Sequence, residues 1–118
     1  MVVRTLQDPR GRWLFDPAHG DARTEWALAG VDDGRIVHVV LDRSFVAAGV
    51  RYIVDFKTGS HQGGDRATFL ARERERYAPQ LARYARIVRA LDDRYPVRIA
   101  LYHPLVEDGW QEEAAPDA

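Results

Sequence analysis

Two short turn signals divide the first half of the chain into three strand-like segments. Asp33-Gly34 separates residues 24–31 from 35–45, and Ala48-Gly49 separates 35–45 from 51–57. Pairs of this kind suit two-residue hairpin turns, in which central residues adopt positive φ. The segments 35–45 and 51–57 contain nearly continuous Val, Ile and Leu, which is typical of strands buried on both faces. The pattern therefore predicts a three-stranded meander covered by helices.

The second half of the chain adds a helix and a further strand. Apolar periodicity predicts a helical region over residues 66–92, bent or broken near Pro79, and a strand over 97–102. We expect an α/β fold in which a mixed central sheet, the meander plus this further strand, is flanked by helices. The expected divisions are an N-terminal arm over 1–23, containing a short helix or irregular structure, a core over 24–110 and a disordered tail over 111–118.

The composition is that of one ordinary globular domain. The chain has 118 residues, 46% of them hydrophobic, and a formal net charge of −1. It has no cysteine, which excludes disulfides and thiolate metal sites and fits a cytoplasmic protein. No apolar run is long enough to span a membrane. Only one of the 17 Lys and Arg residues is lysine, Lys57, and it ends an apolar strand.

Strand pairing predicts a row of carboxylates beside this lysine. With tight turns at the two signals, Asp42 lies opposite Asp55 and Glu25 lies opposite Asp42, on the face that carries Lys57. Like charges directly opposed on neighbouring strands repel, so the row calls for a cation. Oxygen ligands around an open site suit Mg²⁺ or Mn²⁺. The alternative is two ordinary salt bridges, one between Asp42 and Arg43 and one between Asp55 and Lys57.

The helical region carries one polar residue on its apolar side. Gln80 falls inside the apolar arc, one turn before Tyr84, whereas five arginines occupy the opposite side. A buried amide needs partners, so we expect Gln80 and Tyr84 to face the polar end of the sheet. The alternative is a glutamine at the helix margin, in contact with solvent. The arc itself consists of Phe69, Leu70, Tyr77, Leu81, Tyr84, Ile87, Val88 and Leu91.

Three ordered motifs in the chain resemble the signatures of a known nuclease family. They are Asp42-Arg43, then Ile53 to Thr58 (IVDFKT), then Gln80 to Tyr84 (QLARY). The chain resembles, over about residues 11–110, the RecB-like nuclease domains of the PD-(D/E)xK superfamily. These domains occur at the C-terminus of RecB/AddA-type helicase–nucleases. The resemblance implies a restriction-endonuclease-like core.

The resemblance also implies an activity, which is metal-dependent cleavage of DNA phosphodiester bonds, as an exonuclease in repair or recombination. Asp42 and Asp55 would hold Mg²⁺ or Mn²⁺, joined by the backbone carbonyl of Phe56, and Glu25 is a further candidate ligand. Lys57 would orient the attacking water or offset charge on the phosphate. The implied partners are DNA and a helicase, or a larger helicase–nuclease polypeptide. The residues expected to contact DNA are Arg43, Thr58, Gln80 and Tyr84.

The chain departs from the family pattern at its beginning. Family members supply a metal ligand, often histidine, from a helix before the sheet, and we expect an N-terminal truncation that removes this helix. His19 is the candidate substitute. Two other functions therefore stay open: a non-catalytic DNA-binding module that keeps the fold, or an interaction module that docks a partner through Trp13, Phe15 and Trp110.

Overall fold

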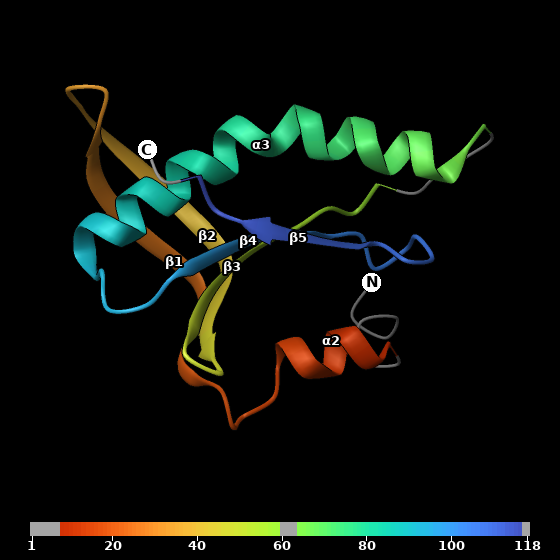
Figure 1. The fold of residues 1–118 in the computed structure, drawn as a ribbon, viewed down its shortest axis with the longest axis horizontal. Helices are drawn as coiled ribbons and strands as arrows, with labels where there is room; N and C mark the ends of the chain where they lie inside the picture. Colours follow the sequence, from red (N-terminus) through yellow and green to blue (C-terminus); the bar gives the residue numbers. More distant parts are fainter. Residues whose placement is uncertain (1–7, 60–63, 117–118) are drawn as a thin grey trace.

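Five strands form one mixed sheet, in which spatial order follows chain order (Figure 1). The computed structural model describes residues 8–59 and 64–116. Within them α3 covers one face of the sheet, called here the α3 face, and the short α2 lies on the other, the α2 face. The elements are α2 (Pro9–Leu14), β1 (Gly20–Asp32), β2 (Arg35–Ala47), β3 (Val50–Phe56), α3 (Arg66–Leu91), β4 (Val97–Tyr102) and β5 (Trp110–Ala114).

The first three strands form the predicted antiparallel meander, in the predicted registers. Leu41 lies opposite Trp26, and Arg43 lies opposite Val54. Asp33 and Gly34 have φ angles of 52° and 74°, as a primed two-residue turn requires. Strand β4 then joins β3 in parallel after α3, and β5 joins β4 in antiparallel orientation. The predicted α/β class with a mixed sheet is confirmed, and the sheet has one strand more than expected.

The sheet separates two apolar clusters. The cluster on the α3 face includes Leu41, Ile53, Leu81 and Val88, and the cluster on the α2 face includes Leu14. Burial of such side chains is the main favourable contribution to folding, at roughly 25 cal/mol per Å² of apolar surface. Each helix is therefore attached to the sheet by its own apolar layer.

Helix α3 runs without interruption from Arg66 to Leu91, so the break expected near Pro79 does not occur. Asp65 caps its first turn by accepting the backbone N–H of Thr68 at 3.1 Å. Pro79 removes one backbone donor, but it lies on the exposed side of the helix. The buried residues Leu81 and Tyr84 follow within the next five positions and pack in the cluster of the α3 face. Helical structure therefore continues beyond the proline, with its apolar side on the sheet.

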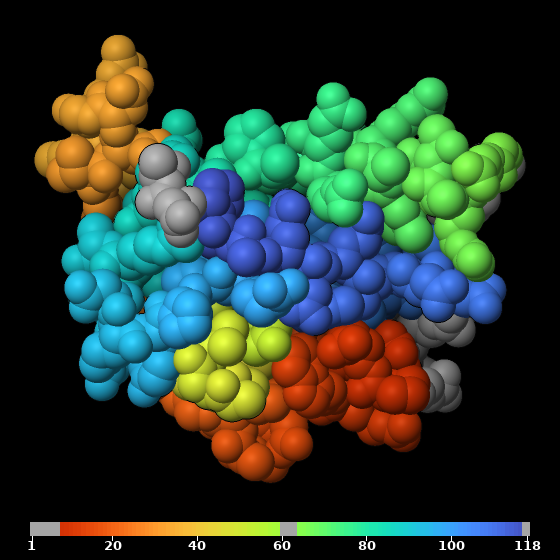
Figure 2. Space-filling view, in the orientation of Figure 1, coloured from red at the N-terminus to blue at the C-terminus, as the bar shows by residue number. Residues whose placement is uncertain are grey.

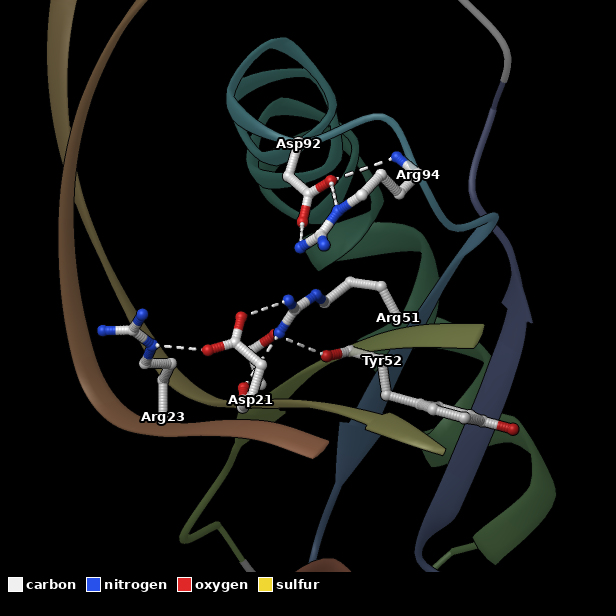
Figure 3. Close-up of polar contacts among 7 residues, drawn as sticks. Asp21, Arg23, Arg51, Tyr52, Asp92 and Arg94 are labelled. Carbon is white, nitrogen blue, oxygen red and sulfur yellow. Dashed lines mark hydrogen bonds and ion pairs between the residues drawn. The ribbon is translucent and has the colours of Figure 1, made fainter. Parts of the chain in front are cut away.

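A buried arginine anchors the end of β3 that lies farther from Lys57 (Figure 3). The Arg51 side chain is 2% exposed and donates to the Asp21 carboxylate and to the Ser44 hydroxyl. Asp21 also accepts a hydrogen bond from Arg23. A buried charge is stable only when paired and hydrogen-bonded. This network therefore ties the start of β1 to β2 and β3.

Both expected terminal divisions change in the structure. Strand β1 begins at Gly20, inside the predicted arm of residues 1–23, and α2 is the short helix expected there. The predicted disordered tail, 111–118, instead contains most of β5, because Trp110–Ala114 pairs with β4. In residues 8–59 and 64–116 no helix is long and apolar enough to cross a membrane.

The outer half of the β1–β2 hairpin projects beyond the rest of the molecule (Figure 2). Its face on the α2 side is uncovered, because α2 packs near the other end of the strands. Val31 and Ile36 are paired across the hairpin there and are 68% and 75% exposed. Val40, further along β2, is 52% exposed. The hairpin thus carries an apolar strip in contact with water.

Candidate functional site

Asp42 and Asp55 meet where β2 and β3 separate. Counted from the turn, the last residue pair between these strands is Arg43 with Val54. Asp42 directly precedes Arg43 in β2 and lies just beyond that pair. Its Oδ2 accepts a hydrogen bond from the backbone N–H of Phe56 at 2.8 Å, so the side chain takes the place of a ladder bond. The Asp42 carboxyl group is close enough to Asp55 to raise the pKa of that residue. The structure therefore brings together the two predicted metal ligands.

Asp55 is a buried carboxyl group on the α3 face. Its residue is 5% exposed, and burial together with a hydrogen bond and repulsion from Asp42 raises its pKa to about 6. Lys57 opposes this shift without cancelling it. Because burial and a second carboxylate disfavour its negative charge, Asp55 binds a proton or a metal cation more readily than an exposed aspartate does.

Lys57 is the positive group beside this carboxylate. Its Nζ lies 2.8 Å from Asp55 Oδ2 and 3.7 Å from the centroid of the Tyr77 ring on α3. Burial lowers the pKa of Lys57, but attraction to the Asp55 carboxylate outweighs burial, so the net pKa lies above its ordinary value. The ammonium group is therefore charged at neutral pH.

The donor set fits a hard divalent cation. Asp55 Oδ2 is buried and, despite its ion pair with Lys57, accepts no hydrogen bond of adequate geometry from the residues that the structure describes. A buried oxygen with unused lone pairs beside a second carboxylate suits Mg²⁺, which commonly binds through one or two carboxylates, waters and a substrate phosphate. Asp42 and Asp55 are the residues that could hold such an ion.

Gln80 and Tyr84 lie together on α3, as predicted. The Gln80 amide donates to the Tyr84 hydroxyl one helical turn away. Both residues line a groove of about 670 Å³ between α3 and β2. The other lining residues are His38, Val39, Val40, Arg76, Pro79 and Arg83. Two arginines and a histidine thus accompany the Gln80–Tyr84 pair along this groove.

Three predicted residues lie outside the cluster. Glu25 is exposed, and its φ of 50° turns the side chain out of the regular alternation of β1. Arg43 is 7% exposed and points to the α2 face, where it donates to the carbonyl of Leu14 at 3.0 Å. His19 is on that face too, stacked on Phe45 with ring centroids 4.2 Å apart. The predicted three-carboxylate row is therefore reduced to two members.

Within residues 8–59 and 64–116, no group of three or more His, Cys, Asp and Glu side chains lies close enough together to hold a metal ion. Thr58 is exposed and follows Lys57 directly. Residues 60–63, shortly after it in the chain, lie outside the described residues.

Two polar residues near Lys57 were missed in the sequence. His103 is fully buried and directly follows β4. The preceding residue, Tyr102, accepts the backbone N–H of Lys57 through its carbonyl at 2.9 Å. His103 Nε2 lies 3.3 Å from Glu73 Oε1 on α3. Its Nδ1 has no hydrogen-bond partner within the described part of the chain. The sequence feature that could have identified His103 is its position directly after the apolar strand 97–102.

Comparison with known proteins adds no family assignment. No protein-family model matches the chain, and no curated protein matches it. The motif resemblance to RecB-like nucleases therefore stays a hypothesis, and the function has to be argued from the residues of the site.

Proposed function

We propose that the chain is a metal-dependent DNA nuclease. The observation that carries the proposal is the buried Asp55, in contact with Asp42 and paired with Lys57 at 2.8 Å. Two carboxylates and one ammonium group at the end of neighbouring strands are the elements needed for phosphodiester hydrolysis. The resemblance of the three motifs to RecB-like nucleases supports the same activity, with exonucleolytic action beside a helicase partner.

The side chains divide the task between binding and charge stabilisation. Asp42 and Asp55 would hold Mg²⁺ or Mn²⁺, which when bound supplies Lewis acidity and an activated water. Lys57 places a fixed positive charge beside that position. Negative charge that develops on a phosphate oxygen is stabilised best by a charge already in place. Lys57 therefore acts on the reacting phosphate, and the two carboxylates act on the metal.

The groove between α3 and β2 is the proposed path of the DNA strand. Gln80 and Tyr84 line it together with Arg76 and Arg83. Arginine contacts to phosphates supply affinity that does not depend on sequence, and amide and hydroxyl groups fix the backbone position. Arg83 also pairs with Asp32 at 2.9 Å, so Arg76 is the freer of the two for phosphate. We expect DNA to enter along this groove.

Cleavage assays with matched substitutions test the nuclease proposal. End-labelled linear single- and double-stranded DNA is incubated with Mg²⁺, Mn²⁺ or EDTA. We expect metal-dependent degradation by the wild type, and a loss of about 100-fold or more in Asp55→Asn and in Lys57→Met. Asp33→Asn makes the same change as Asp55→Asn in an exposed turn and should retain full activity. Absence of cleavage by the wild type with either metal would refute the proposal.

A second candidate function is DNA binding without cleavage, favoured by the arginines of the groove. Under this alternative the wild type binds DNA but does not degrade it. Binding should weaken steeply with salt, because phosphate contacts release counterions. Arg76→Gln should reduce both the affinity and the salt dependence measured by fluorescence anisotropy. Equal binding by the wild type and Arg76→Gln would exclude the groove as the binding surface.

A further inference from the structure

The ammonium group of Lys57 is held between two groups from different elements. Asp55 Oδ2 lies 2.8 Å from Nζ, and the centroid of the Tyr77 ring lies 3.7 Å from Nζ. The lysine side chain is 21% exposed, so most of it is shielded from water. A cation over an aromatic face is attracted by the ring quadrupole, and more strongly once desolvated.

The ion pair with Asp55 does not by itself fix the ammonium group. Lysine carries its charge on a flexible four-carbon stem, whose conformational freedom opposes any single position. The contact between Asp55 Oδ2 and Nζ lacks the geometry of a directed hydrogen bond. A distance to one oxygen leaves the ammonium group free to move around that oxygen. A second contact from another direction removes this freedom.

Tyr77 is well placed to supply that second contact. It packs partly buried against the apolar cluster of the α3 face, which includes Leu81 one turn further along α3. Its ring is therefore fixed by the helix and not by Lys57. The guanidinium of Arg76 also lies 5.2 Å from the ring centroid, so the ring is shared between two cations and Lys57 is the nearer.

We propose that Tyr77 is a positioning residue that holds the Lys57 ammonium group by a cation–π contact for phosphodiester hydrolysis. This inference rests on the proposed nuclease function for its catalytic consequence, whereas the contact itself can be tested without activity. The attraction comes from the ring face. Phenylalanine at position 77 should therefore keep the contact with Lys57, and leucine should abolish it. Fluorination of the ring should weaken the contact in steps, because fluorine withdraws electron density from the ring face.

The contact can be measured directly, because Lys57 is the only lysine in the chain. Protein labelled with ¹³C-lysine should show one side-chain ε-methylene signal, recorded in EDTA. Ring current should move its proton shift upfield from that of lysine in a denatured sample. We expect the upfield shift to persist in Tyr77→Phe and to disappear in Tyr77→Leu. Tyr95→Leu, the same change at a ring that faces Arg94, should leave the signal unchanged.

An upfield shift that is equal in the wild type and Tyr77→Leu would overturn the proposal, as would its absence from the wild type. Where Tyr77→Leu does not fold, the comparison uses phenylalanine, monofluoro-, difluoro- and trifluorophenylalanine at position 77, because these rings are nearly equal in size. Each retains the packing of the ring on the sheet. The Lys57 ε-methylene protons should then become progressively more mobile, with longer ¹H relaxation times, along the series.

The kinetic consequence is a loss in kcat and not in KM. Tyr77→Leu should lower kcat about 3- to 30-fold. In the fluorinated series, kcat should fall with each added fluorine, as the contact weakens. A change confined to KM, or equal kcat across the fluorinated series, would overturn the catalytic role. A wild type that does not cut DNA refutes the proposed function, whereas the ring-current result still decides whether Tyr77 holds Lys57.

Discussion

Asp42 Oδ2 accepts the backbone N–H of Phe56 at 2.8 Å, at the point where β2 and β3 part. The carboxylate thus completes the hydrogen bonding of the strand that carries Asp55 and Lys57. One of its oxygens is used by the fold, and the carboxyl group still contacts Asp55. Asp42 is therefore both a structural acceptor and a candidate metal ligand.

These two roles of Asp42 can be separated by substitution. Asp42→Ala leaves the Phe56 N–H without its acceptor, and we expect the free energy of unfolding in urea to fall by about 1–3 kcal/mol. Asp42→Asn keeps a carbonyl oxygen for that N–H and should cost less. Both variants should lose Mn²⁺ binding in isothermal titration calorimetry. Equal stability of the Ala and Asn variants would show that the hydrogen bond contributes little.

Asp55 should destabilise the metal-free protein at neutral pH. Burial and Asp42 raise its pKa from 3.8 to about 6, so the folded state binds this proton more tightly than the unfolded state. Its contribution to the free energy of unfolding therefore falls as pH rises from 3.8 to about 6, by at most about 3 kcal/mol. Asp55→Asn, which stays neutral, should be more stable than the wild type at pH 7 and nearly equal at pH 4.

Chemical denaturation at several pH values in EDTA measures this difference. Added Mg²⁺ should raise the melting temperature of the wild type at pH 7.5 and leave Asp55→Asn unchanged, because only the carboxylate gains a counter-charge. Parallel stability curves for the two proteins between pH 4 and 7 would contradict the assignment of the raised pKa to Asp55.

Removing Asp21 should cost more stability than removing the charge of Arg51. The Arg51 side chain is 2% exposed, whereas that of Asp21 is 40% exposed. Asp21→Asn leaves a buried guanidinium without its anion, which costs about 3 kcal/mol. Arg51→Met fills a similar volume and leaves Asp21 in water, so its cost should be smaller. Urea unfolding of the two variants compares them, and the reverse order would contradict the pairing.

Gly30 should be intolerant of a side chain, because α3 lies against it. A Cβ at Gly30 would lie 2.9 Å from Ile87 Cγ2. Gly30→Ala should therefore cost about 1–3 kcal/mol, and Ile87→Ala in the same chain should recover part of that loss. Gly20→Ala is the matched control, because its Cβ would meet Val46 at an ordinary 3.7 Å. Additive losses in the double variant would contradict direct contact.

The meander and its register could be predicted because turn chemistry fixes them. Asp33-Gly34 and Ala48-Gly49 both adopt the positive φ angles of primed turns, and each such turn sets the pairing of its strands. This is why Asp42 and Asp55 were placed together correctly. Glu25 was placed by the same rule, and the pairs on either side of it keep the predicted register, but its own φ of 50° interrupts the alternation and its side chain is exposed. Hydrophobic pattern carries little information on such a local irregularity.

Contacts between elements distant in sequence were the other source of error. Strand β5 was interpreted as disordered because Gln111, Glu112 and Glu113 are polar, yet backbone pairing with β4 and the ion pair of Glu112 with Arg98 at 2.7 Å hold it in the sheet. The same holds for Tyr77, which was assigned to the apolar side of the helix. The contact of Tyr77 with Lys57 depends on how α3 is placed on the sheet, and the local sequence pattern of the helix does not determine that placement.

The apolar strip on the projecting β1–β2 hairpin has a consequence for how the protein behaves as a solute. Val31 and Ile36 are exposed on a ribbon whose outer strand, β1, is also an edge of the sheet. Exposed apolar strands at a sheet edge promote association between chains. At the concentrations that NMR demands, we expect aggregation to begin there. Ile36→Lys places a charge on the strip without touching the core and should keep the protein in solution.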